Sequence, residues 1–362
     1  MDIEVFKDKH EHKRVKEYTN SVAKNPLVSV CIQTYQHEDY IKECLDSIII
    51  QKTDFQFEVL LGEDASNDST RAICIRYAKR YPNKIRLFLH HRENNIKING
   101  QPTGRFNFVY NLYSSKGKYI ALCEGDDYWT DPLKLQKQVD FLEANEDYAI
   151  CGALVKCLIV EGDNKEFSDG FFSNTKTTLT TEDFLSGYPM HTSSVLFRRY
   201  MLQLPGWFTK ITNGDVTLFA LLSEKGMAHF MQEVVSVYRV TDTGVWSSIS
   251  LEKRYYAFKN TVNHLNKHFK GTYKKQQYNW EFNEAKKVAQ EFLNKRSYKQ
   301  YVKFILKNYH RYFWWFIWLP KQTQIINFIR NSVQIYWIKF RMFVGLRTHL
   351  KKITALFSTT KK

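Results

Sequence analysis

Two adjacent carboxylates, Asp126 and Asp127, directly follow the apolar run 119–123, whose composition predicts a buried strand. Two carboxylates at a strand end are costly unless a positive charge lies beside them. Mg²⁺ or Mn²⁺, held by one or two carboxylates together with substrate phosphates, meets that requirement. The pair therefore predicts a divalent metal site for a phosphate-bearing ligand. The alternative interpretation is a solvated acidic turn before a helix.

The other polar clusters of the first half also follow strand-like runs. Thr34 and Tyr35 end the β-rich run that begins at Leu27, and Glu63-Asp64 follow the run 57–61. Helical spacing separates these runs, and strands that alternate with helices predict a mainly parallel sheet flanked by helices. Ligands bind such sheets outside the carboxyl ends of the strands. We therefore expect these polar clusters to line one edge of the sheet.

The elements that position these residues can be placed from periodicity and turn signals. Residues 1–25 read as a polar lead-in helix or arm, 90–116 as a looser segment, and the chain from 296 onward as an aromatic and basic tail. Asp131-Pro132 reads as an N-cap followed by a first helical residue. We expect strands over 27–35, 57–61, 85–89, 119–123, 149–160, 192–198 and 228–238, and helices over 38–51, 69–80, 131–144, 215–225 and 249–295.

Several familiar phosphate-binding and catalytic motifs are absent. None of the 15 glycines lies two positions from another, so the dinucleotide-binding pattern G-x-G-x-x-G cannot occur. The P-loop, H-E-x-x-H and G-x-S-x-G patterns do not occur either. If the chain binds phosphates, a metal on carboxylates is the natural means of holding them.

The net charge of +16 is concentrated at the C-terminal end. Residues 292–362 hold 15 lysines and arginines and no acidic residue, which leaves 38 of the 53 basic residues against 37 acidic ones in the rest of the chain. The six cysteines form no C-x-x-C pair and sit mostly in apolar runs, so we expect buried free thiols in a reducing compartment. The charged N-terminus and the lack of a long apolar run favour a cytoplasmic body.

Three segments together resemble the signatures of family 2 glycosyltransferases with the GT-A (nucleotide-diphospho-sugar transferase) fold, of the bacterial surface-glycan type. They are Pro26–Tyr35, Glu58–Thr70 and Gly117–Trp129, in the family's order and at its usual spacing. The resemblance extends over roughly residues 26–245. It implies an α/β domain with a mainly parallel central sheet flanked by helices, followed here by a helical C-terminal extension.

The resemblance also assigns donor-binding roles by position. Thr34 and Tyr35 would line the nucleotide base pocket, and Glu63 would contact the base, commonly uracil. Many members carry Asp at that position, so Glu63 is a departure from the family pattern. Asp127 would ligate the metal, Mn²⁺ or Mg²⁺, that bridges the diphosphate, and Asp126 would lie nearer the ribose.

An inverting sugar transfer needs a general base that takes the acceptor hydroxyl proton. The family usually places this base at the start of a helix in the acceptor half, and Asp215 fits that pattern; a plain helix cap is the alternative. Asp183 and Asp169 are weaker rivals. His191, ahead of a predicted strand, could face the acceptor or the diphosphate, or could be structural.

The loop 241–248 resembles the one that often closes over the donor in related enzymes. Trp246 could cover a sugar ring or belong to the core, and Arg239 is a candidate diphosphate contact. We expect an N-terminal arm (1–25), a catalytic domain (26–248) and a helical, basic-aromatic extension (249–362). Within the catalytic domain, 26–130 would bind the nucleotide-sugar and 131–248 the acceptor.

The aromatic and basic tail favours a membrane surface, because tryptophan and basic residues on amphipathic helices suit lipid headgroups. Packing on the body or on a second subunit is the alternative, and nucleic acid is disfavoured because the aromatics lie in a block.

The sequence thus predicts an inverting, metal-dependent glycosyltransferase of hexosyl or N-acetylhexosaminyl type at the inner face of the cytoplasmic membrane. It would use a nucleotide-sugar, with UDP-sugars favoured, and a lipid-linked or surface polysaccharide precursor as acceptor. A nucleotidyltransferase and a non-catalytic sugar- or membrane-binding relative are the alternatives.

Overall fold

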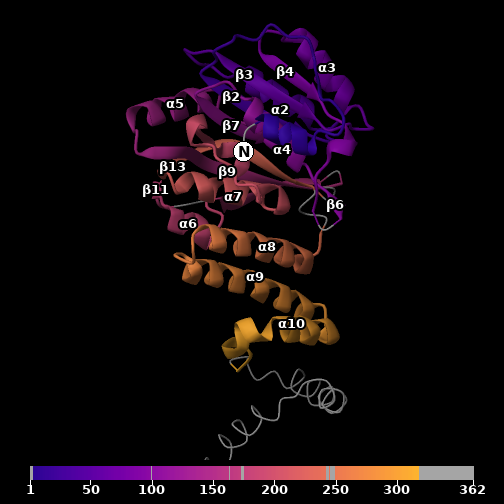
Figure 1. Cartoon of the computed structure of the whole chain (residues 1–362), viewed down its shortest axis with the longest axis vertical. Helices are drawn as coiled ribbons and strands as arrows, with labels where there is room; N and C mark the ends of the chain where they lie inside the picture. The colour runs from indigo at the N-terminus through magenta and orange to yellow at the C-terminus, as the bar shows by residue number, and fades with distance from the viewer. Residues whose placement is uncertain are drawn as a thin grey trace, which may run out of the picture. The chain divides into compact units, whose positions relative to one another are not determined.

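The computed structural model describes residues 3–98, 100–162, 164–172, 175–241, 244 and 249–317, with backbone alone for 169–172 and 309–317 (Figure 1). The chain divides into two compact units, residues 1–281 and 282–362. The predicted site residues that the structure describes all lie in the first unit.

A single large sheet forms the centre of the first unit (Figure 1). Its strand order is β1-β4-β3-β2-β7-β12-β9-β13-β11. In addition, β10 pairs with β9, and β8 pairs with β13. The strands are β1 (Lys16–Glu17), β2 (Val28–Thr34), β3 (Phe57–Glu63), β4 (Ile85–Leu89), β7 (Tyr119–Glu124), β8 (Tyr128–Trp129), β9 (Tyr148–Glu161), β10 (Asn164–Phe172), β11 (Thr178–Leu179), β12 (Leu196–Arg198) and β13 (Met227–Thr241).

The strand directions show a parallel sheet in the first half, as predicted, and a mixed sheet in the second. β4, β3, β2 and β7 run parallel to one another, and their carboxyl ends meet at one edge. β12 is antiparallel to β7 and β9, whereas β13 is parallel to β9. A two-stranded ribbon, β5 (Lys97–Ile98) with β6 (Gln101–Pro102), lies apart from this sheet.

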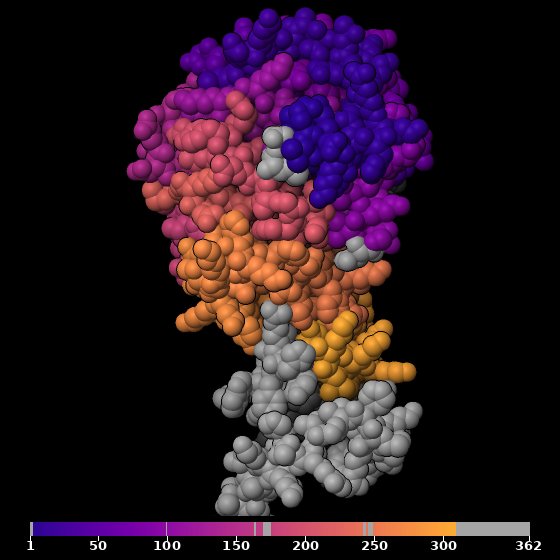
Figure 2. Space-filling model, in the orientation of Figure 1, coloured from indigo at the N-terminus to yellow at the C-terminus, as the bar shows by residue number. Residues whose placement is uncertain are grey.

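Helices cover both faces of the sheet, because alternate strand residues are apolar on both sides. One buried cluster packs α2 (Ile41–Ile49), α3 (Thr70–Arg80) and α5 (Lys134–Ala144) against one face of the sheet. The other cluster packs α1 (Ile3–His10), α4 (Arg105–Ser114), α6 (Thr181–Ser186) and α7 (Gly214–Ser223) against the opposite face. In Figure 2 the N-terminal part of this unit (indigo to purple) and its later part (pink) are in direct contact over the visible face.

The predicted strands and helices are largely confirmed, with corrections at their ends. The helix expected from Asp131 begins only at Lys134, because the Asp131 carboxylate accepts the Leu133 N–H and forms a turn instead of capping the helix. The strand expected over 192–198 is a 3₁₀ turn (Thr192–Ser194) followed by the short strand β12. The helix expected over 249–295 is two helices, α8 (Leu251–His268) and α9 (Lys274–Asn294). The looser segment 90–116 contains α4, which the periodicity did not indicate.

The cysteines are confirmed as free and buried: Cys31, Cys44, Cys74, Cys123, Cys151 and Cys157. No helix within the described ranges has the length and apolar composition that crossing a bilayer requires.

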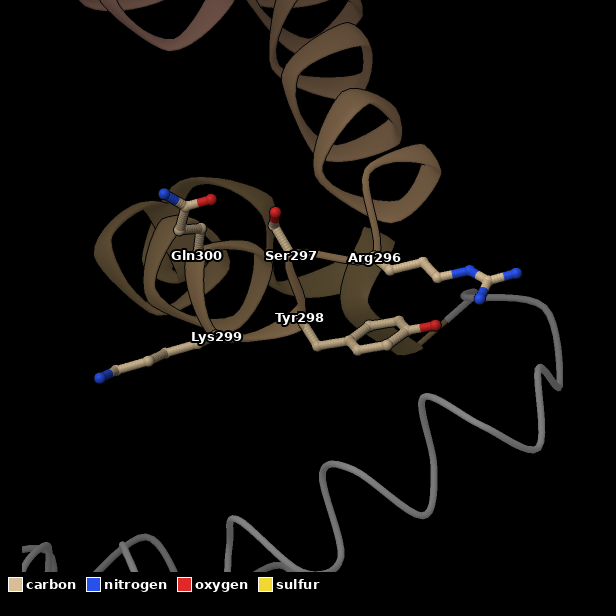
Figure 3. Close-up of a pocket in the computed structure, with 5 residues that line it drawn as sticks. All are labelled: Arg296, Ser297, Tyr298, Lys299 and Gln300. Atoms are coloured by element: carbon tan, nitrogen blue, oxygen red, sulfur yellow. The ribbon is translucent and has the colours of Figure 1, made fainter.

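The second unit contains the end of α9 and helix α10 (Tyr298–Ile317). An open hollow at the turn between them is lined by Arg296, Ser297, Tyr298, Lys299 and Gln300 (Figure 3). The Arg296 and Tyr298 side chains extend to one side of this turn and Lys299 to the other. Since the lining holds two cations and no carboxylate, this hollow is not where the predicted metal chemistry would occur.

Candidate active site

The Asp126-Asp127 turn lies at the carboxyl end of β7, beside the end of β2. The Gly125 N–H donates to the Gln33 carbonyl at 2.9 Å, and the Asp127 N–H donates to the Glu124 carbonyl at 3.1 Å. A Cβ on Gly125 would lie 2.7 Å from the Thr34 side chain, so only glycine allows the turn to approach β2 this closely. The turn is thereby fixed against the strand that carries Thr34.

Asp127 is a buried carboxylate with one oxygen left open. Its Oδ1 accepts the Arg239 backbone N–H at 3.0 Å, while Oδ2 is buried and has no hydrogen-bond partner. Only 1% of the residue is exposed, and burial, with Asp126 close by, raises the pKa of Asp127 well above its usual value. An unpaired buried carboxylate oxygen is unfavourable until a cation binds it. The position and chemistry of Oδ2 therefore fit a divalent ion.

Arg239 is bound to the same turn through its side chain. The guanidinium donates to the Asp126 carbonyl and to the Glu43 carboxylate, and lies over the Tyr128 ring at 4.5 Å. From the sequence we expected Arg239 to be a candidate diphosphate contact. In this structure its guanidinium holds the Asp126-Asp127 turn against α2.

Asp126 and Thr34 both contact His37, which follows β2. The His37 Nε2 lies 3.8 Å from Asp126 Oδ2, and its Nδ1 lies 3.3 Å from Thr34 Oγ1. The structure thus brings Thr34 and Asp126 together, as expected of residues at the ends of neighbouring parallel strands.

Tyr35 lies beside Arg92, which also binds Asp64. The Arg92 guanidinium lies 4.0 Å over the Tyr35 ring and donates to Asp64 Oδ2 at 2.5 Å, and Asn95 Nδ2 donates to the same oxygen at 3.0 Å. Burial raises the pKa of Asp64 to about 6, although Arg92 opposes the shift. This cluster can offer an aromatic or guanidinium face and a carboxylate edge to a planar ligand.

The predicted base contact, Glu63, is fully buried and directed inward. Its Oε1 accepts the Ser66 N–H at 2.6 Å, and its Oε2 accepts from the Arg71 guanidinium. From the sequence we expected Glu63 to contact the base and gave Asp64 no such role. Glu63 ends β3 and Asp64 follows it, and only the side-chain packing distinguishes the residue that binds Arg71 from the one that binds Arg92 beside Tyr35.

His191 lies beside the metal turn in the 3₁₀ turn that precedes β12. Its Nδ1 is 4.0 Å from Asp127 Oδ2 and accepts from the Ser193 N–H, so the neutral ring carries its proton on Nε2. Burial lowers the pKa of His191 to about 3. The imidazole is therefore neutral at physiological pH and forms no ion pair with Asp127.

Asp215 lies in the first turn of α7 and does not cap it. Its Oδ2 accepts from the Tyr188 hydroxyl at 2.5 Å and from Thr192 Oγ1 at 3.4 Å, whereas the cap residue is Asn213. The structure gives Asp215 Oδ1 no hydrogen bond within the described residues. One oxygen of this carboxylate is thus oriented by two hydroxyls, and the other is open to accept a proton.

Glu124 and Arg105 complete the polar end of the site, and Glu124 had no role among the residues expected from the sequence. Glu124 ends β7 on the face that α4 covers, and Arg105 opens α4. Burial, together with the nearby Asp126 and Asp215, raises the pKa of Glu124 to about 8. The alternation of β7, in which Leu122 and Glu124 share a face, could have identified Glu124 as facing the site.

The remaining candidates lie elsewhere. Asp183 is part of a capping box with Thr180 and pairs with Lys176, so its role is structural. The Asp169 side chain and Trp246 lie outside the described residues. Within the described part of the chain, no three His, Cys, Asp or Glu side chains cluster around one point that could hold a metal. An ion at Asp127 would therefore need oxygens from a ligand.

The chain is similar in sequence to known glycosyltransferases. The model of glycosyl transferase family 2 matches residues 29–203. An uncharacterized protein of Mycobacterium tuberculosis is 34% identical over 230 residues, covering 63% of this chain and 62% of that protein. The chain thus spans about three fifths of the length of this relative. The putative teichuronic acid biosynthesis glycosyltransferase TuaG of Bacillus subtilis is 26% identical over 228 residues, covering 62% of this chain and 82% of TuaG.

Solved structures support the fold. The mannosyltransferase PcManGT of Pyrobaculum calidifontis, solved with GDP-Man and Mn²⁺, has a TM-score of 0.50 and 18% identity, with 81% of each chain covered. The predicted GT-A fold is confirmed.

Proposed function

We propose that this chain is an inverting, metal-dependent transferase that moves a sugar from a nucleoside-diphosphate sugar to an acceptor hydroxyl, since the model of glycosyl transferase family 2 matches residues 29–203. The observation that carries the proposal is the arrangement of two carboxylates. Asp127 Oδ2 is buried without a hydrogen-bond partner, and Asp215 Oδ1 has no hydrogen bond within the described residues. His191 lies beside Asp127, and the adjacent Thr192 donates to Asp215. Such an arrangement suits a site that holds a diphosphate and a sugar acceptor side by side.

Asp127 would hold a divalent ion, Mn²⁺ or Mg²⁺, together with oxygens of the donor diphosphate, and Asp126 would lie toward the ribose. When bound, the ion would offset the negative charge on the departing nucleoside diphosphate. The protein's own contribution is to fix the turn: Arg239 and Gly125 hold it against α2 and β2. The neutral His191 adds no competing positive charge at Asp127.

The nucleotide base would lie beside Thr34 and Tyr35. Asp64 supports this assignment more directly than Glu63 does, because both Glu63 oxygens have partners, whereas Arg92 and Asn95 bind the same Asp64 oxygen, Oδ2. A carboxylate acceptor suits the ring N–H of uracil, which favours a UDP-sugar; guanine offers ring and amino N–H groups, so GDP-sugars are the direct competitor. Arg239 and, from the sequence, Trp246 are further donor-side candidates.

Asp215 would act as the general base. In an inverting transfer the acceptor oxygen attacks the anomeric carbon as its bond to the diphosphate breaks, and the acceptor proton moves to a carboxylate. Tyr188 and Thr192 orient Asp215 through Oδ2, which leaves Oδ1 to receive that proton. His191, next to Thr192, would lie on the acceptor side.

The acceptor class is proposed from the relatives' names. TuaG is named for teichuronic acid biosynthesis, a polysaccharide context, which supports a lipid-linked or surface polysaccharide precursor as acceptor and a hexosyl or N-acetylhexosaminyl donor. The C-terminal extension supports work at the inner face of the cytoplasmic membrane, because residues 292–362 are basic and free of acidic residues. In the described part of α10, Lys299 and Lys303 are both exposed.

The test is release of nucleoside diphosphate from a panel of UDP-, GDP- and dTDP-sugars with Mn²⁺ or Mg²⁺, repeated with chelator and with Asp127→Ala. We expect slow hydrolysis of one donor that chelator and the substitution both abolish. Calorimetry of UDP and GDP binding provides a second readout. Nucleotide binding by the wild type should depend on the metal, whereas adding the metal should not change the affinity of Asp127→Ala.

Two other functions make opposite predictions in the same experiment. A nucleotidyltransferase would release pyrophosphate from a nucleoside triphosphate and leave every sugar donor intact. A non-catalytic relative would hydrolyse no donor, and its binding activity would survive Asp127→Ala. Either result would remove the transferase assignment.

A further inference from the structure

Arg105 is a buried cation that the proposed chemistry does not use. It is the first residue of α4 and is 7% exposed. Its Nη2 donates to the Thr212 carbonyl at 2.7 Å and to the Ile211 carbonyl at 3.3 Å, and its guanidinium lies 4.9 Å over the Phe208 ring. All these contacts are made with the segment that leads into α7. Arg105 therefore connects the donor half of the domain to the helix that carries Asp215.

Gly214 allows this contact. A Cβ at position 214 would lie 1.5 Å from Arg105 Nη1, so any other residue would displace the guanidinium from the two carbonyls. Gly214 immediately precedes Asp215 and begins α7. The position of the guanidinium and the start of the helix are thus set by the same backbone.

The opposite side of this segment is also fixed. Thr261 Oγ1, on α8, donates to Asn213 Oδ1 at 3.1 Å, and Asn260 Nδ2 donates to the Lys210 carbonyl at 3.1 Å. Arg105 from α4 and this pair from α8 therefore hold the 210–214 segment between them. The carbonyls of Lys210, Ile211 and Thr212 thereby gain side-chain donors with defined directions.

The charge of Arg105 also has a function. A buried guanidinium is costly, and burial lowers the pKa of Arg105 to about 10, whereas Asp215 and Glu124 oppose that shift. The group still carries its charge at neutral pH. Among the described residues no hydrogen bond joins it directly to either carboxylate, so it acts on them at a distance through the low-dielectric interior.

We propose that Arg105 is the positioning residue for Asp215: it fixes the 211–214 segment and supplies a buried positive charge that keeps the Asp215 carboxylate in place beside the acceptor. This proposal rests on the proposed role of Asp215 as general base. Because Arg105 acts through another residue, its loss should affect turnover only while Asp215 can act.

The test compares Arg105→Lys with Arg86→Lys. Arg86 is also 7% exposed and also binds a carbonyl, that of Ser114. Its carboxylate partners, however, are Glu17 of β1 and Glu58 of β3, which are not among the candidate site residues. With the donor hydrolysed fastest in the panel above, we expect Arg105→Lys to lower kcat about 10- to 100-fold with little change in donor KM. Arg86→Lys should leave kcat within about twofold while lowering the melting temperature similarly.

A double-mutant cycle separates positioning from general destabilisation. In an Asp215→Asn background, Arg105→Lys should cause no further loss of kcat. If the two losses multiply, or if Arg86→Lys lowers kcat equally, the proposal is overturned. If Asp215→Asn alone retains full kcat, the base assignment fails instead. Should Arg105→Lys fail to fold, Gly214→Ala, which displaces the guanidinium and keeps its charge, replaces it with the same expected and contradicting outcomes.

Discussion

At the scale of single residues, Asp127 and Asp215 resemble each other in their hydrogen bonding but differ in their surroundings. Each carboxylate has one oxygen fixed by a neighbour and one without a partner in the described structure. Asp127 is buried and has its fixed oxygen on a backbone N–H, which suits a cation. Asp215 is partly exposed and is held by two hydroxyls, which suits a proton acceptor.

Asp215→Asn should test the second of these roles. The amide keeps the size of the side chain and can still accept from Tyr188, so the fold should be retained while the proton acceptor is lost. We expect kcat for donor hydrolysis to fall about 10²- to 10⁴-fold. Tyr188→Phe, which removes only the orienting hydroxyl, should cause a smaller loss. Equal kcat in wild type and Asp215→Asn would contradict the assignment.

His90 provides a pH prediction away from the site. It is fully buried among Phe88, Phe106 and Tyr110, neither ring nitrogen has a hydrogen-bond partner, and burial lowers its pKa to about 3 from 6.5. Between these values the unfolded chain binds a proton that the folded chain does not, so stability falls as pH drops below about 6.5.

His90→Gln should remove this contribution. We expect the loss of unfolding free energy between pH 7 and pH 5 to be smaller in the variant, by up to about 1.4 kcal/mol per pH unit for one proton. The measurement is urea unfolding at both pH values. An unchanged pH dependence would show that His90 is not the group responsible.

At the scale of elements, α4 is held against the sheet by asparagine side chains. Asn107 Nδ2 donates to the Gly62 carbonyl at 2.7 Å, and Asn111 Nδ2 donates to the Ile32 carbonyl at 2.9 Å. Gly62, the last but one residue of the buried strand β3, allows this approach because a Cβ there would lie 1.8 Å from Asn107 Oδ1. The packing of α4 in turn places Arg105 near α7.

Gly62→Ala should therefore destabilise the domain, because Asn107 must move and its hydrogen bond weakens. We expect a loss of about 1–3 kcal/mol of unfolding free energy. Gly206→Ala is the matched control, since a Cβ at Gly206 meets nothing within 4 Å, and it should be nearly neutral. Equal stability of the two variants would show that the close contact between α4 and β3 is not required.

At the scale of the whole molecule, the excess positive charge is separated in sequence from the candidate site. The candidate site residues lie in the first unit, and the excess positive charge lies in residues 292–362. A basic surface attracts anionic lipid over about one Debye length, so the attraction should weaken with salt.

Removal of residues 318–362 should leave donor hydrolysis intact and reduce sedimentation with phosphatidylglycerol vesicles. The full chain should bind these vesicles in a salt-sensitive manner and should bind phosphatidylcholine vesicles weakly. Undiminished vesicle binding by the truncated chain would place the attraction elsewhere. If the full chain bound neither kind of vesicle, the proposed membrane association would be contradicted.

The sequence by itself determined most of the strands and helices in the first half, the polar strand ends and the fold, because strand alternation, helical spacing and adjacent carboxylates are local patterns. It also singled out Asp126, Asp127 and Asp215 as candidates, each beside a recognisable element boundary. Only the tertiary structure decided which carboxylate oxygens are free, that Glu63 binds Arg71 while Asp64 binds Arg92, and that Arg239 holds the turn. These outcomes depend on partners distant in sequence, such as Arg71, Arg92 and Glu43, and no local pattern encodes such pairings.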